Sequence, residues 1–580
     1  MEYTTLVAVY NRLSATDATG EKRAILADVF ADAGGALPRL VVLVWGRLGP
    51  AYDRPELGVS SSLALEAVCR ATGAAKSAVR ERWRETGDLG SAAAWAAEHG
   101  GQQTLFAESL TVDRVHERLR EVATFAGEGS RTRRVDAVAG LVADADPDEA
   151  CYVVRTVLGH VRVGVGEGLI RDALADAFLD GSDAAVAAIE SAYQVTSDYP
   201  LVAERAREAG LDGVQALDIS LGRPVRAMLA AKAASLDAGL SSAAGPDDRI
   251  HCEYKYDGVR VQLHVDDEIR VFTRRLADVT AQFPDVVRAV ERGIEGPAIL
   301  DGEVVGYDPA TLGGDAAARA PVPFQELSTR VKRERGVERV AAEVPVVFHA
   351  FDYLYNGATL LDRPLADRLD RLESRLTPIS PRPAGDPAVA GLELATAART
   401  SADDPDPAAA LYRAALETGH EGLVLKDPTA PYTPGRRVGR LLKLKPTMEP
   451  LDLVVTRAKY SEGRRSGLLG RLSLACRDEA ASEAGDPALR EVGRLSTGYT
   501  DDELAALTDR LEARVVARDG RAVDLQPGVV LEVEYEEIQR SDAYDSGYAL
   551  RFPRFLGTRA DLGLADVDTL ARVEHLYESQ

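Results

Sequence analysis

The sequence predicts a multidomain fold in which an all-α domain, a mixed α+β domain and a small β-barrel follow one another. Its 580 residues exceed what a single hydrophobic core usually supports. The spacing of apolar residues changes from three and four to two near Leu221–Ala230, and patterns of short strands predominate after Pro446. We therefore place the three domains at residues 1–222, 223–446 and 447–580.

The first domain is predicted to be helical throughout. Its segments repeat apolar residues at three- and four-residue spacing, which is typical of amphipathic helices. The expected helices are Tyr3–Leu13, Glu21–Ala33, Ser61–Ala71, Ala75–His99, Thr111–Phe125, Arg131–Ala143, Pro147–Val161 and Leu169–Phe178. Turns rich in Gly and Asp separate them.

The second domain combines strand patterns with a few helical stretches. The expected strands are Ile250–Tyr256, Val259–Val265, Ile269–Thr273, Ala298–Tyr307, Val344–Leu354, Gly422–Lys426 and Leu441–Lys445, and each is a short run of apolar residues. Helices are expected at Val279–Arg292 and Pro364–Arg375. The Pro-, Asp- and Ala-rich run Pro381–Pro407 is predicted to be a mobile surface connection.

The third domain has short strands around one helix, Asp501–Ala517. The strands are expected at Asp452–Tyr460, Gly467–Cys476, Glu491–Thr497, Val529–Ile538 and Tyr548–Phe555. Five strands with an inserted helix fit a small barrel of the oligonucleotide/oligosaccharide-binding (OB) type.

The charge balance is unusual. A net charge of −23 by itself disfavours a polyanionic partner. Only nine of the 69 basic residues are Lys, and the acidic residues are spread along the whole chain. This pattern indicates either a surface adapted to very high salt or an ordinarily acidic, Arg-rich proteome.

Cysteine usage and hydrophobicity exclude several classes of protein. The four cysteines, Cys69, Cys151, Cys252 and Cys476, form no C-x-x-C pair, which argues against a disulfide framework or a structural zinc site. The eight histidines show no clustered metal spacing either. We find no signal peptide and no apolar run long enough for a membrane span. We expect a cytoplasmic monomer with no membrane partner.

The few lysines gather in one part of the sequence. Lys255, Lys426, Lys443 and Lys445 all fall within the predicted second domain, inside short strand-like runs. Lys and Arg are not interchangeable where an amine acts as a nucleophile or as a compact charge. Their retention in an Arg-rich chain points to chemistry at these positions.

The first motif is Glu253-Tyr254-Lys255-Tyr256-Asp257-Gly258-Val259-Arg260. In a strand–turn–strand arrangement, Lys255 ends the first strand, Gly258 supplies the turn, and Asp257 and Arg260 face the same cleft. Asp257 either holds the turn or touches a ligand. A K-x-D-G-x-R pattern alone is only moderately specific.

Four further motifs follow it along the chain. They are Asp301-Gly302-Glu303, Phe351-Asp352, Glu421-Gly422-Leu423-Val424-Leu425-Lys426 and Leu442-Lys443-Leu444-Lys445. In order and spacing the set resembles the covalent nucleotidyltransferase superfamily, which comprises ATP-dependent DNA ligases, RNA ligases and mRNA-capping enzymes. The flanking segments Leu221–Leu229, Phe272–Arg275 and Arg551–Phe555 resemble the ATP-dependent DNA ligases of archaea and eukaryotes, and the composition points to a halophilic archaeon. Arg223 and Arg226 in the first flank are either functional or ordinary solvated charges.

The resemblance covers almost the full length and implies a helical DNA-binding domain, an adenylation (nucleotidyltransferase) domain and an OB-fold domain. It implies an enzyme that seals nicks in duplex DNA during replication, repair and recombination. The implied cofactors are ATP and Mg²⁺, with Mn²⁺ as an alternative metal. AMP would be carried on a lysine and then transferred to the 5′-phosphate of the nick.

The roles implied by the resemblance fall on specific residues. Lys255 would be the nucleophile, Glu253 would border the adenine, and Phe351 would either stack on the adenine or pack in the core. Arg260 and Arg274 would contact the ribose and the nick phosphates, with Lys426 near the sugar-phosphate. Glu303 and Glu421 would lie at the ribose and the divalent metal, because paired carboxylates beside phosphate oxygens suit Mg²⁺. Arg554 and Arg559 would also contact the nucleotide.

The lysine chemistry explains why cationic neighbours are needed. A free lysine has a pKa of about 10.4 and is almost fully protonated at neutral pH, so it cannot attack a phosphate. Neighbouring cations and a metal favour the neutral amine. Lys443 and Lys445 are the expected cations, and they would also bind the phosphates.

One position departs from the family pattern. After the Arg-Phe-Pro-Arg run the family usually carries Arg-x-Asp-Lys, whereas this chain has Arg559-Ala560-Asp561-Leu562. The missing lysine is thought to orient the leaving pyrophosphate. Arg559, Arg554 or solvent potassium would have to replace it.

A shorter motif lies in the helical domain at Gln102-Gln103-Thr104-Leu105-Phe106. In related archaeal enzymes a similar segment docks on the sliding clamp. Here Gln102, Leu105 and Phe106 either bind such a clamp or belong to a plain loop.

Four alternative functions are disfavoured. Among enzymes, the runners-up are an RNA ligase and a capping enzyme. A capping enzyme has no reason to carry about 220 helical residues before the nucleotidyl domain, whereas a clamp around duplex DNA does, since it reads the backbone rather than the bases. An NAD-dependent ligase would carry cysteine zinc ligands. A non-catalytic DNA-binding or clamp-associated scaffold would not have kept Lys255, Glu303 and Glu421 together with Lys443 and Lys445.

Overall fold

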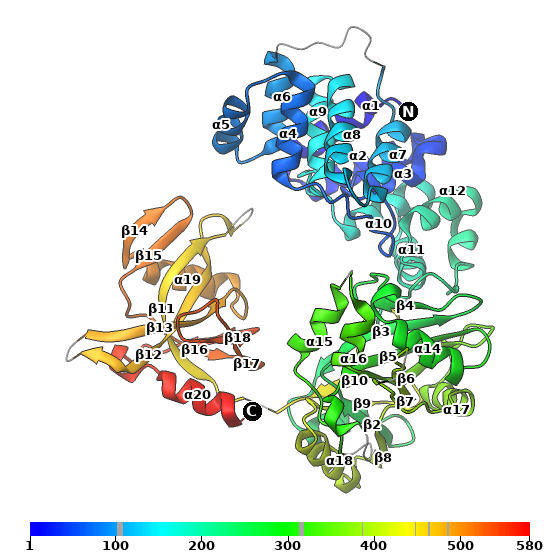
Figure 1. Cartoon of the computed structure of the whole chain (residues 1–580), viewed down its shortest axis with the longest axis vertical. Coiled ribbons are helices and arrows are strands. Elements are labelled where there is room, and N and C mark those ends of the chain that lie inside the picture. Colours follow the sequence, from blue (N-terminus) through cyan, green and yellow to red (C-terminus); the bar gives the residue numbers. More distant parts are fainter. Residues whose placement is uncertain are drawn as a thin grey trace. The chain divides into compact units, whose positions relative to one another are not determined.

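The computed structural model describes residues 1–100, 108–312, 318–333, 335–384, 387–446, 448–461, 465–483 and 486–579. The chain divides into two compact units, Met1–Lys445 and Pro446–Gln580. Figure 1 shows helices at the start of the first unit, and strands together with further helices in the rest of the chain. None of the helices in the described ranges combines the length and hydrophobicity that crossing a membrane requires.

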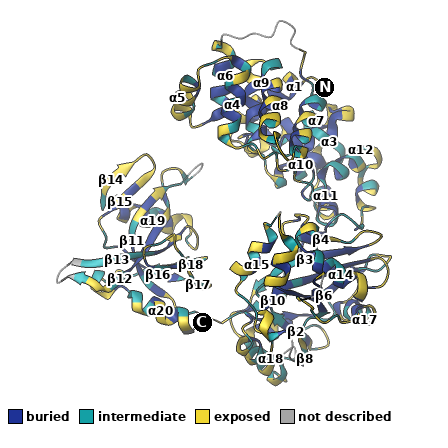
Figure 2. Ribbon diagram, viewed as in Figure 1, coloured by how far each residue is buried: buried dark blue, intermediate teal, exposed yellow. Residues whose placement is uncertain are grey.

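The N-terminal part of the first unit is helical, as predicted. Its helices are α1 (Tyr3–Ser14), α2 (Thr19–Asp32), α3 (Leu37–Leu43), α4 (Ser61–Thr72), α5 (Lys76–Thr86), α6 (Leu89–His99), α7 (Val112–Thr124), α8 (Ser130–Asp144), α9 (Pro147–Val157), α10 (Glu167–Phe178), α11 (Asp183–Thr196) and α12 (Tyr199–Gln215). Their apolar faces meet in one core, seen as the buried residues between the helices in Figure 2. Burial of this apolar surface is what stabilises such short helices.

The predicted helix Ala75–His99 is wrong in one respect, because it is two helices. Gly87 ends α5 in a left-handed conformation with φ 66°, and the Asp88 side chain then caps α6 by accepting from the backbone N–H groups of Gly90 and Ser91. Glycine adopts this conformation without steric cost, and Asp is a preferred N-cap. The helices α3, α11 and α12 were not predicted individually.

The second part of the first unit contains two sheets. One has the strand order β1-β10-β9-β2-β8 and the other β4-β3-β5-β6-β7. The strands are β1 (Leu229–Lys232), β2 (Arg249–Lys255), β3 (Val259–Val265), β4 (Arg270–Thr273), β5 (Ala298–Gly306), β6 (Val346–Tyr355), β7 (Gly391–Leu394), β8 (Ala397–Ser401), β9 (Gly422–Lys426) and β10 (Arg437–Leu444). The helices are α13 (Leu236–Ala243), α14 (Pro284–Gly293), α15 (Phe324–Val331), α16 (Val337–Glu343), α17 (Leu365–Arg375) and α18 (Asp406–Glu417).

The first sheet packs one of its faces into an apolar core. In the first sheet Cys252, Leu423, Leu425, Leu442 and Leu444 point into a core covered by α13 and α18. The residues between them point to the opposite face, because side chains alternate along a strand. Lys255, Lys426 and Lys443 therefore share the face that is turned away from this core.

The predicted surface connection Pro381–Pro407 is wrong. It contains β7, which pairs in parallel with β6, and β8, which pairs antiparallel with β2. Strand pairing with distant residues fixes Gly391–Leu394 and Ala397–Ser401, although the composition of the run suggests a loop. The predicted helix Val279–Arg292 is also shortened, because α14 begins only at Pro284.

The C-terminal unit is built mainly from strands. They are β11 (Leu451–Tyr460), β12 (Leu469–Glu483), β13 (Asp486–Leu495), β14 (Val515–Asp519), β15 (Ala522–Leu525), β16 (Val530–Glu534), β17 (Glu537–Arg540), β18 (Tyr548–Arg551) and β19 (Arg554–Thr558), with helices α19 (Asp501–Glu512) and α20 (Leu570–Ser579). β12, β15 and β16 all pair with β11, β13 pairs with β12, and β19 pairs with β16. Two buried clusters fill this unit.

Three predicted boundaries in this unit are wrong. The helix predicted at Asp501–Ala517 ends at Glu512, and the residues after it form the hairpin β14–β15. The strand predicted at Val529–Ile538 is divided into β16 and β17, which belong to different sheets. The strand predicted at Tyr548–Phe555 is interrupted at Phe552, whose φ of 49° is left-handed, and at Pro553, which lacks a backbone donor.

Candidate active site

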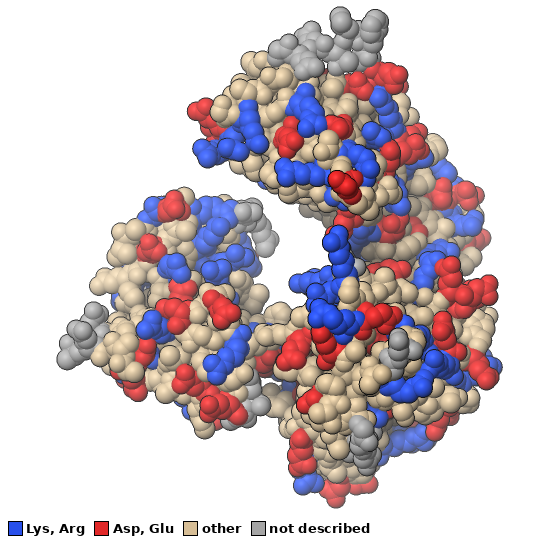
Figure 3. Space-filling view, viewed as in Figure 1, with Lys and Arg blue, Asp and Glu red and all other residues tan. Residues whose placement is uncertain are grey.

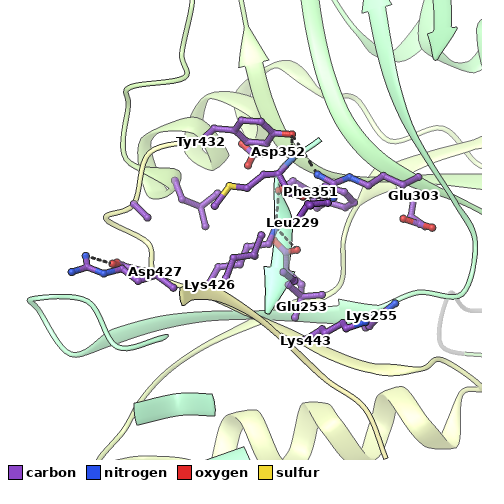
Figure 4. A pocket seen from close by; sticks show the side chains of 18 of the residues that line it. Leu229, Glu253, Lys255, Glu303, Phe351, Asp352, Lys426, Asp427, Tyr432 and Lys443 are labelled. Carbon is purple, nitrogen blue, oxygen red and sulfur yellow. Dashed lines mark hydrogen bonds and ion pairs between the residues drawn. The ribbon is translucent and has the colours of Figure 1, made fainter. Parts of the chain in front are cut away.

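A cavity of about 270 Å³ lies between the two sheets of the first unit. Residues of β1, β2, β9 and β10 line it from one sheet, and residues of β3, β5 and β6 line it from the other. It contains most of the predicted site residues, namely Glu253, Lys255, Arg260, Arg274, Glu303, Phe351, Lys426 and Lys443. Figure 4 shows how several of these side chains lie.

Lys255 is the last residue of β2, and its ammonium group is ion-paired with the Glu421 carboxylate. Lys445 Nζ lies 2.8 Å from the other oxygen of the same carboxylate. Burial raises the pKa of Glu421, but Lys255 and Lys445 outweigh that effect and hold the pKa below its ordinary value. Glu421 is therefore an ionised group shared by two lysines.

Gly258 explains how Glu303 comes close to this lysine. A Cβ atom at residue 258 would lie 2.4 Å from the backbone oxygen of Val304 and 2.9 Å from Glu303 Cγ. Only glycine leaves room for the turn after β2 to approach β5 this closely. Asp257 lies in this turn and is half-buried.

Glu303 differs from Glu421 in its protonation. Burial raises its pKa to about 8, the nearby Glu421 carboxylate adds to the rise, and Lys255 and Arg260 only partly oppose it. Two carboxylates at close range disfavour each other's charged form. A divalent cation between them would reverse this effect.

Glu253 lies deeper in the cavity with its side chain only 3% exposed. Its Oε2 is 2.6 Å from Lys426 Nζ and its Oε1 is 2.8 Å from His251 Nε2. Burial raises its pKa, but Lys426 and His251 together hold the pKa below its ordinary value. Figure 4 shows Lys426 and Glu253 pointing toward each other.

Phe351 is half-buried and lines the cavity instead of packing entirely in the core. Lys426 Nζ lies 4.7 Å from the centre of its ring, and the Arg260 guanidinium carbon lies 5.3 Å from it. Lys426 also donates to the Phe351 backbone oxygen at 3.2 Å. Cations over an aromatic face are attracted to it, so these two residues fix the ring in place.

Arg260 is held by residues that were not predicted. It donates to both oxygens of Asp301, at 3.1 and 2.7 Å, and to the Met228 backbone oxygen at 2.7 Å. The Tyr432 hydroxyl donates to Asp301 at 2.7 Å. Asp301 belongs to the Asp301-Gly302-Glu303 motif, but no pattern in the sequence indicates that it binds Arg260. No pattern singles out Tyr432 either.

The pair Arg368–Asp352 also lines the cavity and was not predicted. Arg368 donates to the two Asp352 oxygens at 2.7 and 3.0 Å, and both side chains are buried. A buried, doubly hydrogen-bonded pair of this kind is rigid. It forms a fixed wall beside Phe351.

Arg226 is not an ordinary solvated charge. Its guanidinium lies 2.7 Å from Glu167 in the helical part of the unit and also donates to the Tyr193 hydroxyl. The segment Leu221–Leu229, which contains Arg226, thus connects the helical part to the cavity.

Arg274 lines the cavity, and burial together with the nearby Arg260 lowers its pKa.

The remaining predicted residues lie elsewhere. Arg554 and Arg559 belong to the C-terminal unit, where Arg559 is ion-paired with Asp452 and Asp561 at 2.8 and 2.9 Å. Leu562 packs against the buried cluster of Val454, Ala475, Val530 and Val567. Gln102, Leu105 and Phe106 lie outside the described residues.

Neither the acidic side chains nor the cysteines form a metal site by themselves in the described part of the chain. No group of three or more His, Cys, Asp or Glu side chains suited to a metal occurs in the ranges that the structure describes. The four cysteines form no disulfide, and Cys252 is a buried core residue behind the first sheet. A metal at Glu303 and Glu421 would therefore need further ligands from a substrate.

Three family models match the chain. The ATP dependent DNA ligase domain matches residues 227–445, the DNA ligase N terminus matches residues 2–175, and the ATP dependent DNA ligase C terminal region matches residues 465–562. The first of these contains the whole cavity and every lysine that lines it.

Curated relatives match over nearly the full length. The chain is 44% identical to a DNA ligase of Haloferax volcanii, with 96% of each protein covered, and 42% identical to one of Halobacterium salinarum, with 98% of each covered. It is 38% identical to a DNA ligase of Methanothermobacter thermautotrophicus, covering all of this chain and 98% of that one. Several such relatives come from halophilic archaea.

Among solved structures, "Pmar-Lig_PreS3" covers 95% of this chain and 99% of its own, with a TM-score of 0.54 and 15% identity. At this identity the likeness shows a shared fold. Together with the domain models and the full-length relatives, the lysine-lined cavity leads to one conclusion. The chain belongs to the family of ATP-dependent DNA ligases.

Proposed function

We propose that Lys255 carries AMP during the ligase reaction of this enzyme. As a member of its family, the protein is a DNA ligase that uses ATP to seal nicks in duplex DNA. The observation that carries the assignment is the placement of the Lys255 amine at the cavity wall, in contact with Glu421 and beside Glu303. An enclosed amine with fixed neighbours suits nucleophilic catalysis.

We assign the two ends of the cavity to the two ends of the nucleotide. Phe351, Glu253 and Lys426 would hold the adenine, because an aromatic face and a buried carboxylate suit a base with an exocyclic amine. Lys426 is therefore assigned to the adenine, and not to the sugar-phosphate as the resemblance implied. Lys255 and Lys443 would then contact the phosphates. Lys445 is ion-paired with Glu421 and would act on the site through that carboxylate.

Arg260 and Arg274 would contact the ribose and the nick phosphate. Asp301 and Tyr432 fix the Arg260 guanidinium, so the arginine needs little reordering when a ligand binds. Preorganised donors of this kind lose less entropy on binding.

The carboxylates of Glu303 and Glu421 fit a divalent cation such as Mg²⁺ or Mn²⁺. Their oxygens are the ligands that these hard cations prefer, and phosphate oxygens would complete the coordination. Burial and the nearby Glu421 carboxylate raise the pKa of Glu303, and a bound cation would offset both effects. When bound, the metal would stabilise negative charge on the phosphates.

The chemistry at Lys255 then follows from its contacts. Glu421, which is ionised and ion-paired with the Lys255 ammonium, is placed to accept a proton from it and leave a neutral amine. The amine nitrogen attacks the α-phosphorus of ATP, a P–N bond forms, the bond to the pyrophosphate oxygen breaks, and the nitrogen releases its second proton to solvent. AMP next passes to the 5′-phosphate of the nick, and the 3′-hydroxyl finally displaces it.

The proposal is tested by separating these steps. The Lys255→Ala variant should not form the covalent adenylate, yet it should still seal a nick whose 5′-end already carries AMP, because that step does not use the amine as nucleophile. Failure on both substrates with the fold intact would indicate a general role in DNA binding, and full activity on both would refute the assignment.

We also propose that the C-terminal unit is an OB-fold. The pairings β13–β12–β11–β16–β19 form a continuous path, and β18, which precedes β19 in the chain, packs against β13 at the other end of this path. Strands that follow such a path, with α19 inserted after β13, support an OB arrangement. Arg554 and Arg559 are proposed to contact the nucleotide phosphates, and Leu562→Lys should accelerate adenylate formation if the missing lysine limits that step.

The sliding clamp remains a proposed partner of residues Gln102, Leu105 and Phe106. Replacing Leu105 and Phe106 with Ala should abolish stimulation of nick sealing by the clamp and leave the basal rate unchanged. An unchanged stimulation would assign this segment to a plain loop. A cytoplasmic monomer is the proposed working form, and sedimentation with and without nicked DNA tests the oligomeric state.

A further inference from the structure

Glu253 lines two cavities at once. The first is the nucleotide cavity, and the second has a volume of about 290 Å³. His251 and Ala397 of the first sheet line one side of the second cavity. Ala350 and Leu394 of the second sheet and Glu373 of α17 line the other side. The space between the sheets thus continues past the residues proposed to hold the adenine.

Glu253 lies between the two cavities, with Lys426 lining the first and His251 lining the second. His251 Nε2 lies 2.8 Å from one oxygen of the Glu253 carboxylate, and Lys426 Nζ lies 2.6 Å from the other. The side chains of His251, Glu253 and Lys426 are 14%, 3% and 9% exposed. The carboxylate is therefore held from both sides in a single orientation.

Strand register explains this arrangement. His251 and Glu253 are two residues apart on β2, so their side chains point to the same face of the sheet. His251 is paired with Lys426 across β9 and with Arg399 across β8. The other charged groups at the second cavity are Asp370 and Glu373 of α17.

We infer that His251 is a positioning residue that aims the Glu253 carboxylate at the adenine amine and closes the base pocket against the second cavity. This inference rests on the proposed function, in which Glu253 borders the adenine. A carboxylate accepts a hydrogen bond from the exocyclic amine of adenine, whereas it repels the carbonyl oxygen that guanine has at that position. A fixed carboxylate discriminates better than a mobile one, since a mobile one can turn away from the wrong base.

The imidazole also limits the size of the base that fits. A substituent on the adenine amine would have to extend past Glu253 toward the second cavity, where the His251 ring lies. Replacing this ring with a methyl group should leave room in the second cavity for a substituent that extends past Glu253. A larger base could then be accepted, a gain of activity that loss of stability alone would not produce.

The experiment measures covalent adenylate formation by the full-length enzyme with ATP, GTP and N6-benzyl-ATP. The variants are His251→Ala, which removes the ring, and His251→Gln, whose amide can still donate to Glu253. His264→Ala is the matched control, because His264 is a buried histidine of the same domain that accepts a hydrogen bond from the Gly222 backbone outside the cavity. Glu253→Gln tests the underlying assignment.

We expect His251→Ala to raise the KM for ATP by roughly 3- to 10-fold with little change in kcat, as for loss of one hydrogen bond. The same variant should discriminate less between ATP and GTP in covalent adenylate formation. It should also form the covalent intermediate with N6-benzyl-ATP. His251→Gln should restore the KM and still reject the larger base. His264→Ala should change neither selectivity, even if it lowers the Tm.

Two failures are distinguishable. If Glu253→Gln leaves the KM and the base preference unchanged, the carboxylate is not at the base and the proposed function must be revised. If Glu253→Gln alters them but His251→Ala matches wild type with all three nucleotides, the inference about His251 is overturned while the assignment of Glu253 stands.

Discussion

Lys255 and Glu421 are joined twice, once through their backbones and once through their side chains. The Glu421 backbone N–H donates to the Lys255 carbonyl oxygen at 2.9 Å, and the Lys255 ammonium is ion-paired with the Glu421 carboxylate. The backbone hydrogen bond fixes the position of the Glu421 main chain beside Lys255. The ion pair then holds the Lys255 ammonium group next to the Glu421 carboxylate. The position of the nucleophile therefore depends on a residue 166 positions away in the chain.

Replacing Glu421 with Gln should slow covalent adenylate formation by at least about 100-fold, equivalent to about 2.7 kcal/mol in the barrier. The amide keeps the size of the side chain but cannot accept the lysine proton or bind a cation as a carboxylate does. The rate is measured with α-labelled ATP at saturating Mg²⁺. Lys445→Ala should cost less, since it removes only a neighbour of Glu421, and a wild-type rate for Glu421→Gln would contradict the assignment.

Replacing Glu303 with Gln should stabilise the ligand-free enzyme at high pH. The folded-state pKa of Glu303 is about 8, above the ordinary value of 4.5, so the folded state binds the proton more tightly than the unfolded state does. Stability contributed by this proton is fully present below pH 4.5 and is lost as the pH rises through 8.

The variant and wild type should therefore have similar Tm values at pH 4.5, and the variant should be more stable at pH 8.5. A gain of about 1 kcal/mol would appear as a rise of about 2–4 °C in the transition of a domain of this size. Thermal unfolding without nucleotide or divalent metal is the measurement. An equal difference at both pH values would show that Glu303 titrates normally.

Replacing Asp301 with Ala should destabilise the first unit. Loss of one partner of a fully buried pair costs about 3–5 kcal/mol. Because 21% of the Arg260 side chain is exposed to solvent, we expect the free energy of unfolding to fall by about 2–3 kcal/mol. Urea unfolding followed by fluorescence measures the change. Tyr432→Phe, which removes only the hydroxyl bonded to Asp301, should cost about 1 kcal/mol, and equal costs for the two variants would contradict this arrangement.

Nick sealing should persist in molar KCl if the acidic surface is a salt adaptation. Figure 3 shows acidic and basic side chains interleaved over the visible face of each unit. An ordinary protein with several phosphate contacts loses about 10³–10⁵ in affinity between 50 and 200 mM salt. We expect this enzyme to lose less than about tenfold in rate as KCl is raised to molar concentration, and strong inhibition by modest salt would contradict the adaptation.

The strands that carry the chemistry could be predicted from the sequence because their patterns are local. The alternating Leu442-Lys443-Leu444-Lys445 predicts two leucines in the core and two lysines on the other face. β10, which ends at Leu444, places both leucines in the core and Lys443 in the cavity. Glu303 and Phe351 lie within long apolar strands that are easily recognised. The order of these motifs led directly to the family.

What the sequence did not predict depends on distant contacts. β7 and β8 lie in an Ala- and Pro-rich segment and are strands only because β6 and β2 pair with them. Tyr432 is in a loop, and its role arises from its contact with Asp301, 131 positions earlier. His251 is a single histidine two residues before Glu253, and only the folded pair shows that it contacts the carboxylate.

The most direct test of the account is to find where AMP is attached. The wild-type enzyme is incubated with α-labelled ATP and divalent metal, digested, and its labelled peptide identified by mass spectrometry. We predict a single acid-labile adenylate on Lys255, and no labelled peptide from Lys255→Arg, whose guanidinium is not nucleophilic. Label on Lys443 or Lys445 instead, or full labelling of the arginine variant, would contradict the central claim.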